Sequence, residues 1–425
     1  MLQTLVSAWK VPELRRKLLF TAAMLAIYRL GSFIPAPGVN SNALEQALAN
    51  QGGIFSLLAL FSGGGLARLG VFALGIMPYI TASILLQVGT AAFPSLQALQ
   101  KEGELGQRRI TQYTRYLTIA LAAMQALAYT YAFHSQALGG AAAGRLINFN
   151  FGNVILVVVT LTAGAALLMW IGELITQRGI GNGMSLLIFA SILTSAPAGI
   201  NAWWNGTAFE KLSLPLVVIM IVIAVTYVQE GIRKIPIQYA KRMVGRRMTT
   251  GGSTYLPLRV NMAGVIPVIF AAALIALPPT VGQLMPYGWS HSIARLLQPG
   301  GWPFILGEGF LIFGFTFVYV AVVFNSIEQA DNLKKYGGFI PGVRPGRPTA
   351  QYLERVLVRL TVAGALFLAL VAVLPDLFIK YFGFSTATAR ALGGTSVLIV
   401  VGVAIDTVRQ LESQLSMRSY KGFLK

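Results

Sequence analysis

The chain has 425 residues, of which 55% are hydrophobic and only 11% are charged, against roughly a quarter in an ordinary soluble domain. Its 33 Lys and Arg outnumber 14 Asp and Glu, so the formal net charge is +19. Too few polar side chains remain to cover a soluble globule, which excludes a soluble fold and indicates a membrane protein. The absence of cysteine excludes disulfides and thiolate chemistry, and the two histidines, His134 and His291, argue against a histidine-built metal site.

Ten apolar stretches of about the length that crosses a bilayer follow one another along the chain. They lie near residues 18–34, 71–92, 116–133, 154–171, 184–200, 212–229, 262–278, 304–324, 357–374 and 392–408. The first stretch lacks a small-residue cleavage site, so we expect a retained span rather than a signal peptide. The sequence therefore predicts an all-α, polytopic membrane protein with ten transmembrane helices.

A short apolar run separates the first two stretches. It covers residues 54–61 and is followed by Ser62 and the triplet Gly63-Gly64-Gly65. The run is too short to cross a bilayer. Two interpretations stay open: an interfacial helix on the outer surface, or a re-entrant helix folded into a central cavity and hinged at the glycines.

Positive charge is divided unevenly between the loops on the two sides of the ten stretches. The side that carries both termini holds 26 of the 33 Lys and Arg residues. The other side holds the remaining seven, which are Arg29, Arg68, Arg145, Lys211, Arg295, Lys380 and Arg390. Because cytoplasmic loops collect Lys and Arg, we expect both termini to be cytoplasmic.

Ionisable side chains are scarce within the stretches. Glu173, Glu230 and Asp406 lie near their cytoplasmic ends, where water reaches them. A proton-driven pump would place carboxylates or histidines at mid-membrane, and no lysine-bearing phosphate loop is present. We therefore expect no enzymatic activity, no cofactor and no metal site.

The two halves of the chain share a short motif. Residues 75–80 read Gly-Ile-Met-Pro-Tyr-Ile and open the second stretch, while residues 264–269 read Gly-Val-Ile-Pro-Val-Ile and open the seventh. Each motif thus lies on the second span of a group of five, and five is odd, so the groups would be inverted relative to each other. We predict an N-terminal half over residues 1–205 and a C-terminal half over residues 206–425.

Two cytoplasmic loops, at about 231–260 and 325–355, are longer than a chain reversal needs. Both are basic, and their candidate docking residues are Arg242, Arg246, Arg247, Lys334, Lys335, Arg344 and Arg347. One interpretation is charge that fixes topology and contacts lipid headgroups, and the other is docking of a cytoplasmic partner. Prolines and glycines around Arg344 favour a stiff, shaped tip.

Six sequence blocks resemble the SecY family in the family's order, and the resemblance covers essentially the whole chain. They are Tyr28–Pro35, Gly75–Ile80, Arg178–Gly183, Asn261–Pro267, Asp331–Lys335 and Pro341–Gly346. The resemblance implies the channel-forming subunit of a protein translocon in the cell (inner or plasma) membrane. Its two halves would enclose an hourglass pore, with a lateral gate between spans two and three and spans seven and eight.

The resemblance also assigns residues to the pore. A plug helix at about 54–65 would include Ile54, Phe55, Leu57, Leu58, Leu60, Phe61, Gly63, Gly64 and Gly65. The constriction ring would consist of Ile76, Ile80, Ile188, Ile266, Ile269 and Ile399. A ring of branched aliphatic side chains can gate by dewetting and seal around a moving chain without specific bonds. This chemistry supports an aliphatic ring in part, but an isoleucine more often faces lipid or a neighbouring helix, and only the resemblance selects these six.

Partners follow from the same resemblance. The basic loops would receive the ribosome, through its RNA, or the SecA motor ATPase, with Arg344 as the most sensitive residue. SecE and a SecG-like subunit would be membrane partners, anionic lipid would contact the loops, and signal peptides and secretory polypeptides would be the cargo.

Four polar residues lie on the helices expected to form the gate, namely Thr81, Gln87, Gln125 and Asn261. One interpretation is that they hold the closed gate by interhelical hydrogen bonds worth about 0.6–2 kcal/mol each. Ordinary interhelical packing is the other interpretation, and the sequence does not decide between them.

Two other functions compete with a protein channel. A secondary transporter of a small solute would also show broken helices and inverted halves, but it needs convergent polar groups at the midplane, which the spans do not offer. A purely structural scaffold would leave the glycine-hinged helix and the long basic loops without a purpose.

Overall fold

The computed structural model describes residues 7, 9–39, 62–134, 150–239, 243–244, 247–248, 253–284, 292, 296–297, 300–384, 388 and 393–422. Within these residues, one helix corresponds to each of the ten predicted stretches. They are α2 (Pro12–Phe33), α5 (Met77–Ala92), α7 (Glu104–His134), α10 (Phe151–Arg178), α11 (Gly183–Trp204), α12 (Ala208–Glu230), α13 (Ile266–Leu284), α15 (Trp302–Val323), α17 (Arg347–Phe382) and α19 (Gly394–Gly422).

Length and apolarity separate these helices. In the part of the chain that the structure describes, six helical spans are each long and apolar enough to cross a membrane. They are α10, α11, α12, α17, α19 and the run from α15 into α16 (Ser326–Lys335). A seventh span meets the same criterion if α5 and its bent continuation α6 (Pro94–Lys101) are counted together. The prediction of a predominantly helical, multi-pass membrane protein is confirmed.

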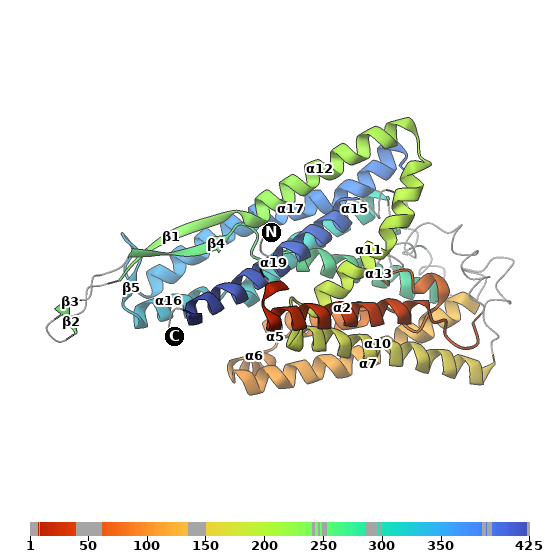
Figure 1. The fold of residues 1–425 in the computed structure, drawn as a ribbon, viewed down its shortest axis with the longest axis horizontal. Helices are drawn as coiled ribbons and strands as arrows, with labels where there is room; N and C mark the ends of the chain where they lie inside the picture. Colours follow the sequence, from red (N-terminus) through yellow and green to blue (C-terminus); the bar gives the residue numbers. More distant parts are fainter. Residues whose placement is uncertain are drawn as a thin grey trace.

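The helices form two groups that meet along the middle of the molecule (Figure 1). In the first group α7 packs on α5 and α10, and α10 packs on α2. In the second, α15 packs on α13 and α17, while α19 packs on α12 and α17. The groups touch where α11 packs on α19 and where α13 packs on α5 and α7. The predicted division at 205/206 falls in the short connection between α11 and α12, and it stays a prediction.

The start of α5 differs from the predicted start of the second stretch, residue 71. The helix begins at Met77, with Pro78 in its first turn, and residues 71–76 form turns. Gly75 has a φ of +57°, which is a left-handed conformation that ends a helix. Glycine adopts this conformation at little cost because it has no Cβ. Pro78 then suits a helix start, because its missing N–H has no partner in the first turn anyway. The chain thus reaches α5 through a series of tight turns.

The sequence between α10 and α11 is rich in glycine because the turn that it forms leaves no room for larger residues. Asn182 caps α11, its side-chain oxygen accepting from the backbone N–H of Met184 at 3.0 Å. Gly181 has a φ of +84°, and a Cβ on Gly183 would collide with the carbonyl oxygen of Gly172. Only glycine at these places lets α11 pack this closely against α10.

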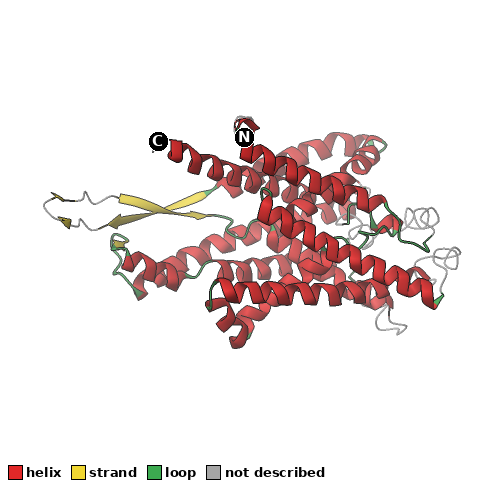
Figure 2. Cartoon of the chain, turned by 60° about the horizontal axis from the view of Figure 1, so that its bottom comes forward, coloured by secondary structure: helices red, strands yellow, loops and turns green. Residues whose placement is uncertain are grey.

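The first long basic loop folds into strands that the sequence analysis did not anticipate. β1 (Ile232–Tyr239) pairs antiparallel with β4 (Ser253–Arg259), and β5 (Gly338–Phe339) adds to the other edge of β1. A two-stranded piece, β2 (Met243–Val244) with β3 (Arg247–Met248), lies farther along the same loop. The hairpin projects well beyond the helical bundle (Figure 2).

A small hydrophobic core fixes the hairpin to the second basic loop. Ile235 of β1, Leu258 of β4 and Ile340 pack with Leu353 and Val356 of α17, all of them buried. The two loops therefore pack together into one folded unit at the start of the long helix α17, rather than forming two separate flexible loops.

Candidate functional site

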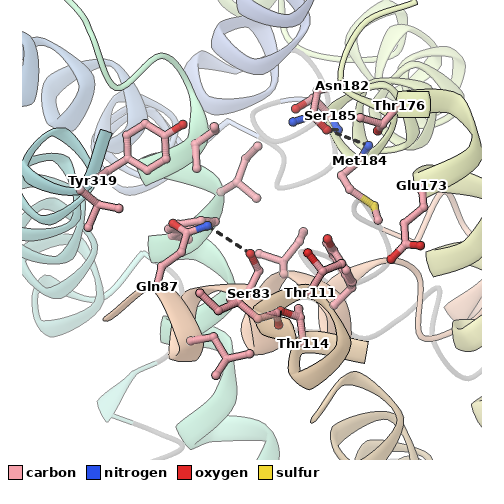
Figure 3. Close-up of a pocket in the computed structure, with 18 of the residues that line it drawn as sticks. Ser83, Gln87, Thr111, Thr114, Glu173, Thr176, Asn182, Met184, Ser185 and Tyr319 are labelled. Carbon is pink, nitrogen blue, oxygen red and sulfur yellow. Dashed lines mark hydrogen bonds between the residues drawn. The ribbon is translucent and has the colours of Figure 1, made fainter. Parts of the chain in front are cut away.

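A cavity of about 510 Å³ opens between the two helix groups, on the side that carries the basic loops. Its walls come from α5, α7, α10, α11, α13 and α15 (Figure 3). Both helix groups thus contribute side chains to one hollow.

The predicted ring isoleucines gather at this cavity. Ile80, Ile188, Ile266 and Ile269 line it. Ile76 and Ile399 are buried in the large hydrophobic cluster that also contains Ile80, Ile188 and Ile269, and Ile266 packs against it. Five of the six are at most 4% exposed, and Ile266 is half-buried. Four of the six thus share the wall of one cavity, and the constriction ring as a whole stays a prediction.

Much of the remaining cavity lining is polar, and of these polar side chains only Gln87 was expected to have a role at the gate. Thr111 and Thr114 come from α7, Thr176 from α10, and Ser185 from α11 (Figure 3). A signal existed in the sequence: Gln107, Thr111 and Thr114 repeat at the i, i+4, i+7 spacing of one helix face. Hydroxyls and amides keep such a space wet without fixing a charge.

One ion pair stands in the cavity wall. The Arg115 guanidinium on α7 binds both carboxylate oxygens of Glu173 on α10, with Nε–Oε1 at 2.9 Å and Nη2–Oε2 at 2.6 Å. Arg115 is 37% exposed and Glu173 is 13% exposed at the side chain. The bidentate geometry neutralises both charges and joins two helices of the first group.

We expect Arg115→Ala to lower the unfolding midpoint of the purified protein by a few degrees. The change leaves the Glu173 carboxylate, which is only 13% exposed, without its partner, and this costs about 1–3 kcal/mol. Arg109→Ala is the matched control, because the Arg109–Glu102 pair is 3.8 Å apart and exposed, so it contributes little. The double variant Arg115→Leu, Glu173→Leu should recover most of the loss. An equal drop for both single variants would contradict the assignment.

The expected lateral gate corresponds to contacts of α13 with α5 and α7, and of α15 with α5. The polar gate residues do not bridge these helices in a uniform way. Thr81 donates to the carbonyl of Met77 at 3.0 Å, and Gln87 donates to Ser83 at 3.2 Å, so both bonds stay within α5. Gln125 is half-buried on α7. Asn261 lies elsewhere, in a second cavity beside α12 and α19.

Most of the expected plug, Ile54, Phe55, Leu57, Leu58, Leu60 and Phe61, lies outside the described residues. The described glycines form a held turn. Gly63 and Gly64 have φ values of +62° and +81°, and Arg29 donates to the carbonyl of Gly63 at 3.0 Å. The Tyr28 hydroxyl lies against Gly63 and bonds Ser191 of α11. This turn is therefore bonded to α2 through Arg29 and lies against Ser191 of α11.

The described docking residues lie on the surface of the basic loops. Lys334 and Lys335 end α16, while Arg344 and Arg347 flank the start of α17, and all four are exposed. Arg247 belongs to β3, whereas Arg242 and Arg246 lie outside the described residues. The turn that carries Arg344 is closed by Thr349, whose hydroxyl donates to the Arg344 carbonyl at 2.8 Å.

Comparisons with known proteins agree with this geometry. The SecY family model matches residues 70–408. Over the full length of both chains, the sequence is 47% identical to the protein translocase subunits SecY of Corynebacterium glutamicum, Mycobacterium tuberculosis and Streptomyces coelicolor.

Solved structures share the fold at low sequence identity. A protein-conducting channel superposes with a TM-score of 0.63 at 18% identity, covering 93% of this chain and 91% of that one. Sec61 in the canine ribosome–channel complex of the endoplasmic reticulum gives a TM-score of 0.60 at 19% identity, with the same coverage.

Proposed function

The chain belongs to the SecY family of protein translocase subunits, and we propose that its pore runs through the isoleucine ring between the two helix groups. Unfolded secretory polypeptides would enter the polar cavity, pass the ring and leave on the far side. The observation that supports this proposal is that Ile80, Ile188, Ile266 and Ile269, from both helix groups, line one cavity.

The chemistry of the cavity suits a cargo of arbitrary sequence. A path for any polypeptide must not hold fixed charges that capture one kind of side chain. The charges of Arg115 and Glu173 neutralise each other, and the remaining polar groups that line this cavity are hydroxyls and amides. A solute transporter would instead need several polar groups converging on one small ligand.

Gating would use the two features that flank the ring. We assign the plug to residues 54–65, hinged at Gly63, Gly64 and Gly65, and the lateral gate to the contacts of α5 and α7 with α13 and α15. Hydrophobic segments would leave through that gate into lipid. A signal segment opens such a two-state element only by binding the open state better than the closed one.

Energy and assembly would come from partners, because the chain carries no nucleotide-binding motif. The exposed basic residues of the joined loops suit SecA or ribosomal RNA. Solved relatives in the ribosome complexes of canine Sec61 and yeast Ssh1 share this fold. We further propose SecE and a SecG-like subunit as membrane partners, contacts with anionic lipid, and an inner-membrane location with both termini in the cytoplasm.

Cysteine crosslinking tests the proposed path directly in this cysteine-free chain. We expect Ile188→Cys to crosslink to a stalled secretory chain in reconstituted vesicles only when SecA is active. A cysteine at Ser62 should become newly accessible from outside at the same time. Leu193→Cys is the control, since that side chain is exposed on the outer surface of α11. If Ile188→Cys never meets the chain during active translocation, the pore assignment is wrong and a solute transporter has to be reconsidered.

A further inference from the structure

A second cavity, of about 420 Å³, lies beside the first and belongs mainly to the C-terminal half. It shares Asn182, Ser185, Ile266 and Tyr319 with the first cavity, so the two are neighbouring lobes of one hollow. Its own walls come from the end of α12, the residues leading into α13, and α19. Its volume is in the range of pockets that hold ligands.

Two buried amides in this lobe each have an unused hydrogen-bonding atom. Gln229 and Asn261 are both 5% exposed, and both line the cavity. Among the described residues, the Nε2 of Gln229 and the Oδ1 of Asn261 have no hydrogen-bond partner. Buried polar groups in native proteins are almost always satisfied, so such a pair indicates a ligand or ordered solvent.

The orientation of the Asn261 amide is fixed by its own segment, and the backbone of Gln229 is held by α19. The Nδ2 of Asn261 donates to the carbonyl of Gly264 at 3.0 Å, which leaves Oδ1 as the free end and makes that end an acceptor. The backbone carbonyl of Gln229 accepts from Arg409 of α19 at 3.0 Å, which holds the end of α12 in place. Gly402 provides the room, because a Cβ there would lie 2.8 Å from the Gln229 Nε2.

The site thus offers one donor and one acceptor with charges of both signs nearby. Arg259 and Asp406 form an ion pair at 3.7 Å in the same wall. A phosphate or another anion would suit Gln229 but would oppose the Asn261 oxygen and Asp406. A cation would suit those oxygens but would oppose the Gln229 N–H and the arginines. A polypeptide backbone supplies C=O groups that the Gln229 amide can bind and N–H groups that the Asn261 oxygen can bind.

We propose that Gln229 and Asn261 form a subsite that hydrogen-bonds the backbone of a polypeptide in the cytoplasmic hollow, whatever its side chains. This inference rests on the proposed function and names how that cargo is held before it reaches the ring. Recognition by backbone alone is what a channel for arbitrary sequences needs, since every residue except proline carries both groups.

The test compares Gln229→Met with Gln410→Met, the same change at an exposed amide of the same cavity. A cysteine at Thr407, a half-buried cavity residue, probes the lobe, while Ile188→Cys reports on the main path. The cargo is a stalled secretory chain with one cysteine, with either a Gly-Ser or an Ala-Leu segment placed at the lobe.

We expect Gln229→Met to lower the yield of the Thr407 crosslink about three- to tenfold for both segments, the effect of one lost hydrogen bond. Gln410→Met should leave the yield unchanged, and the Ile188 crosslink should persist. The unfolding midpoint of Gln229→Met should stay equal or rise, because the variant removes an unpartnered amide. Asn261→Ser should act in the same direction, as a second variant at the other end of the subsite.

Three results would overturn the inference. An unchanged Thr407 yield in Gln229→Met means that the amides bind only solvent. A Thr407 probe that never meets the chain, while Ile188 does, means that cargo does not enter the lobe and leaves the proposed function intact. Loss of both probes in the unsubstituted background would refute the proposed path and the subsite together.

Discussion

Replacing Ile188 with serine is expected to make the resting channel leak ions. The side chain is 2% exposed and lines the cavity at the level where isoleucines of both halves meet. An apolar constriction of this kind excludes ions because water does not wet it. A hydroxyl at that level stabilises water in the gap, and a barrier lowered by about 1.4 kcal/mol already raises the flux about tenfold.

The measurement is ion conductance across vesicles that contain the purified protein without cargo. Ile192→Ser is the matched control: Ile192 lies one turn farther along α11, is equally buried at 2% exposed, and does not line the cavity. Both variants lose a similar buried side chain, so both should lose similar stability. We expect the leak only for Ile188→Ser, and Ile188→Val should stay sealed. Equal leaks at both positions would mean general loosening of the bundle rather than a breached ring.

The ten spans were predictable because each stretch of about 20 apolar residues has few alternatives to a helix in lipid. The β1–β4 hairpin was not, since only Ile235 and Ile237 of β1 are buried and Pro236 stands between them. The partners that bury Ile235, among them Leu258 and Leu353, come from other parts of the chain. Strand pairing of this kind depends on tertiary contacts that a local pattern does not contain.

The candidate site was also only partly predictable from the sequence. The ring isoleucines came from the family resemblance, because an isoleucine facing lipid and one facing a pore look alike in sequence. The hydroxyls of Thr111 and Thr114 had a helical spacing that marks one polar face, yet nothing local said which helix they would meet. Asn261 was expected at the gate, but its amide is fixed by the next turn of its own segment, at Gly264. Such short-range bonds are set by backbone geometry rather than by residue type alone.

Arg344→Glu is expected to abolish most SecA-driven translocation without unfolding the protein. Arg344 is exposed in the turn between β5 and α17, where Gly342 and Gly346 adopt φ values of +82° and +100°. The turn is anchored by Thr349 and rests on the core that joins both basic loops. A charge on so rigid a support loses little entropy when it meets an acidic partner, so its reversal should matter more than the reversal of a freely moving one.

We expect the rate of SecA-dependent transport to fall at least tenfold, which corresponds to about 1.4 kcal/mol of lost interaction. Arg355→Glu is the control, because this substitution reverses the same charge on an exposed face of α17, beyond the turn. The defect of Arg344→Glu should be accompanied by an unchanged unfolding midpoint and weaker binding of SecA to the reconstituted channel. Raising the salt concentration should reduce SecA binding to the unsubstituted channel, since exposed charges are screened. If both variants reduce transport equally, the basic face acts through its total charge, and the shaped turn has no special role.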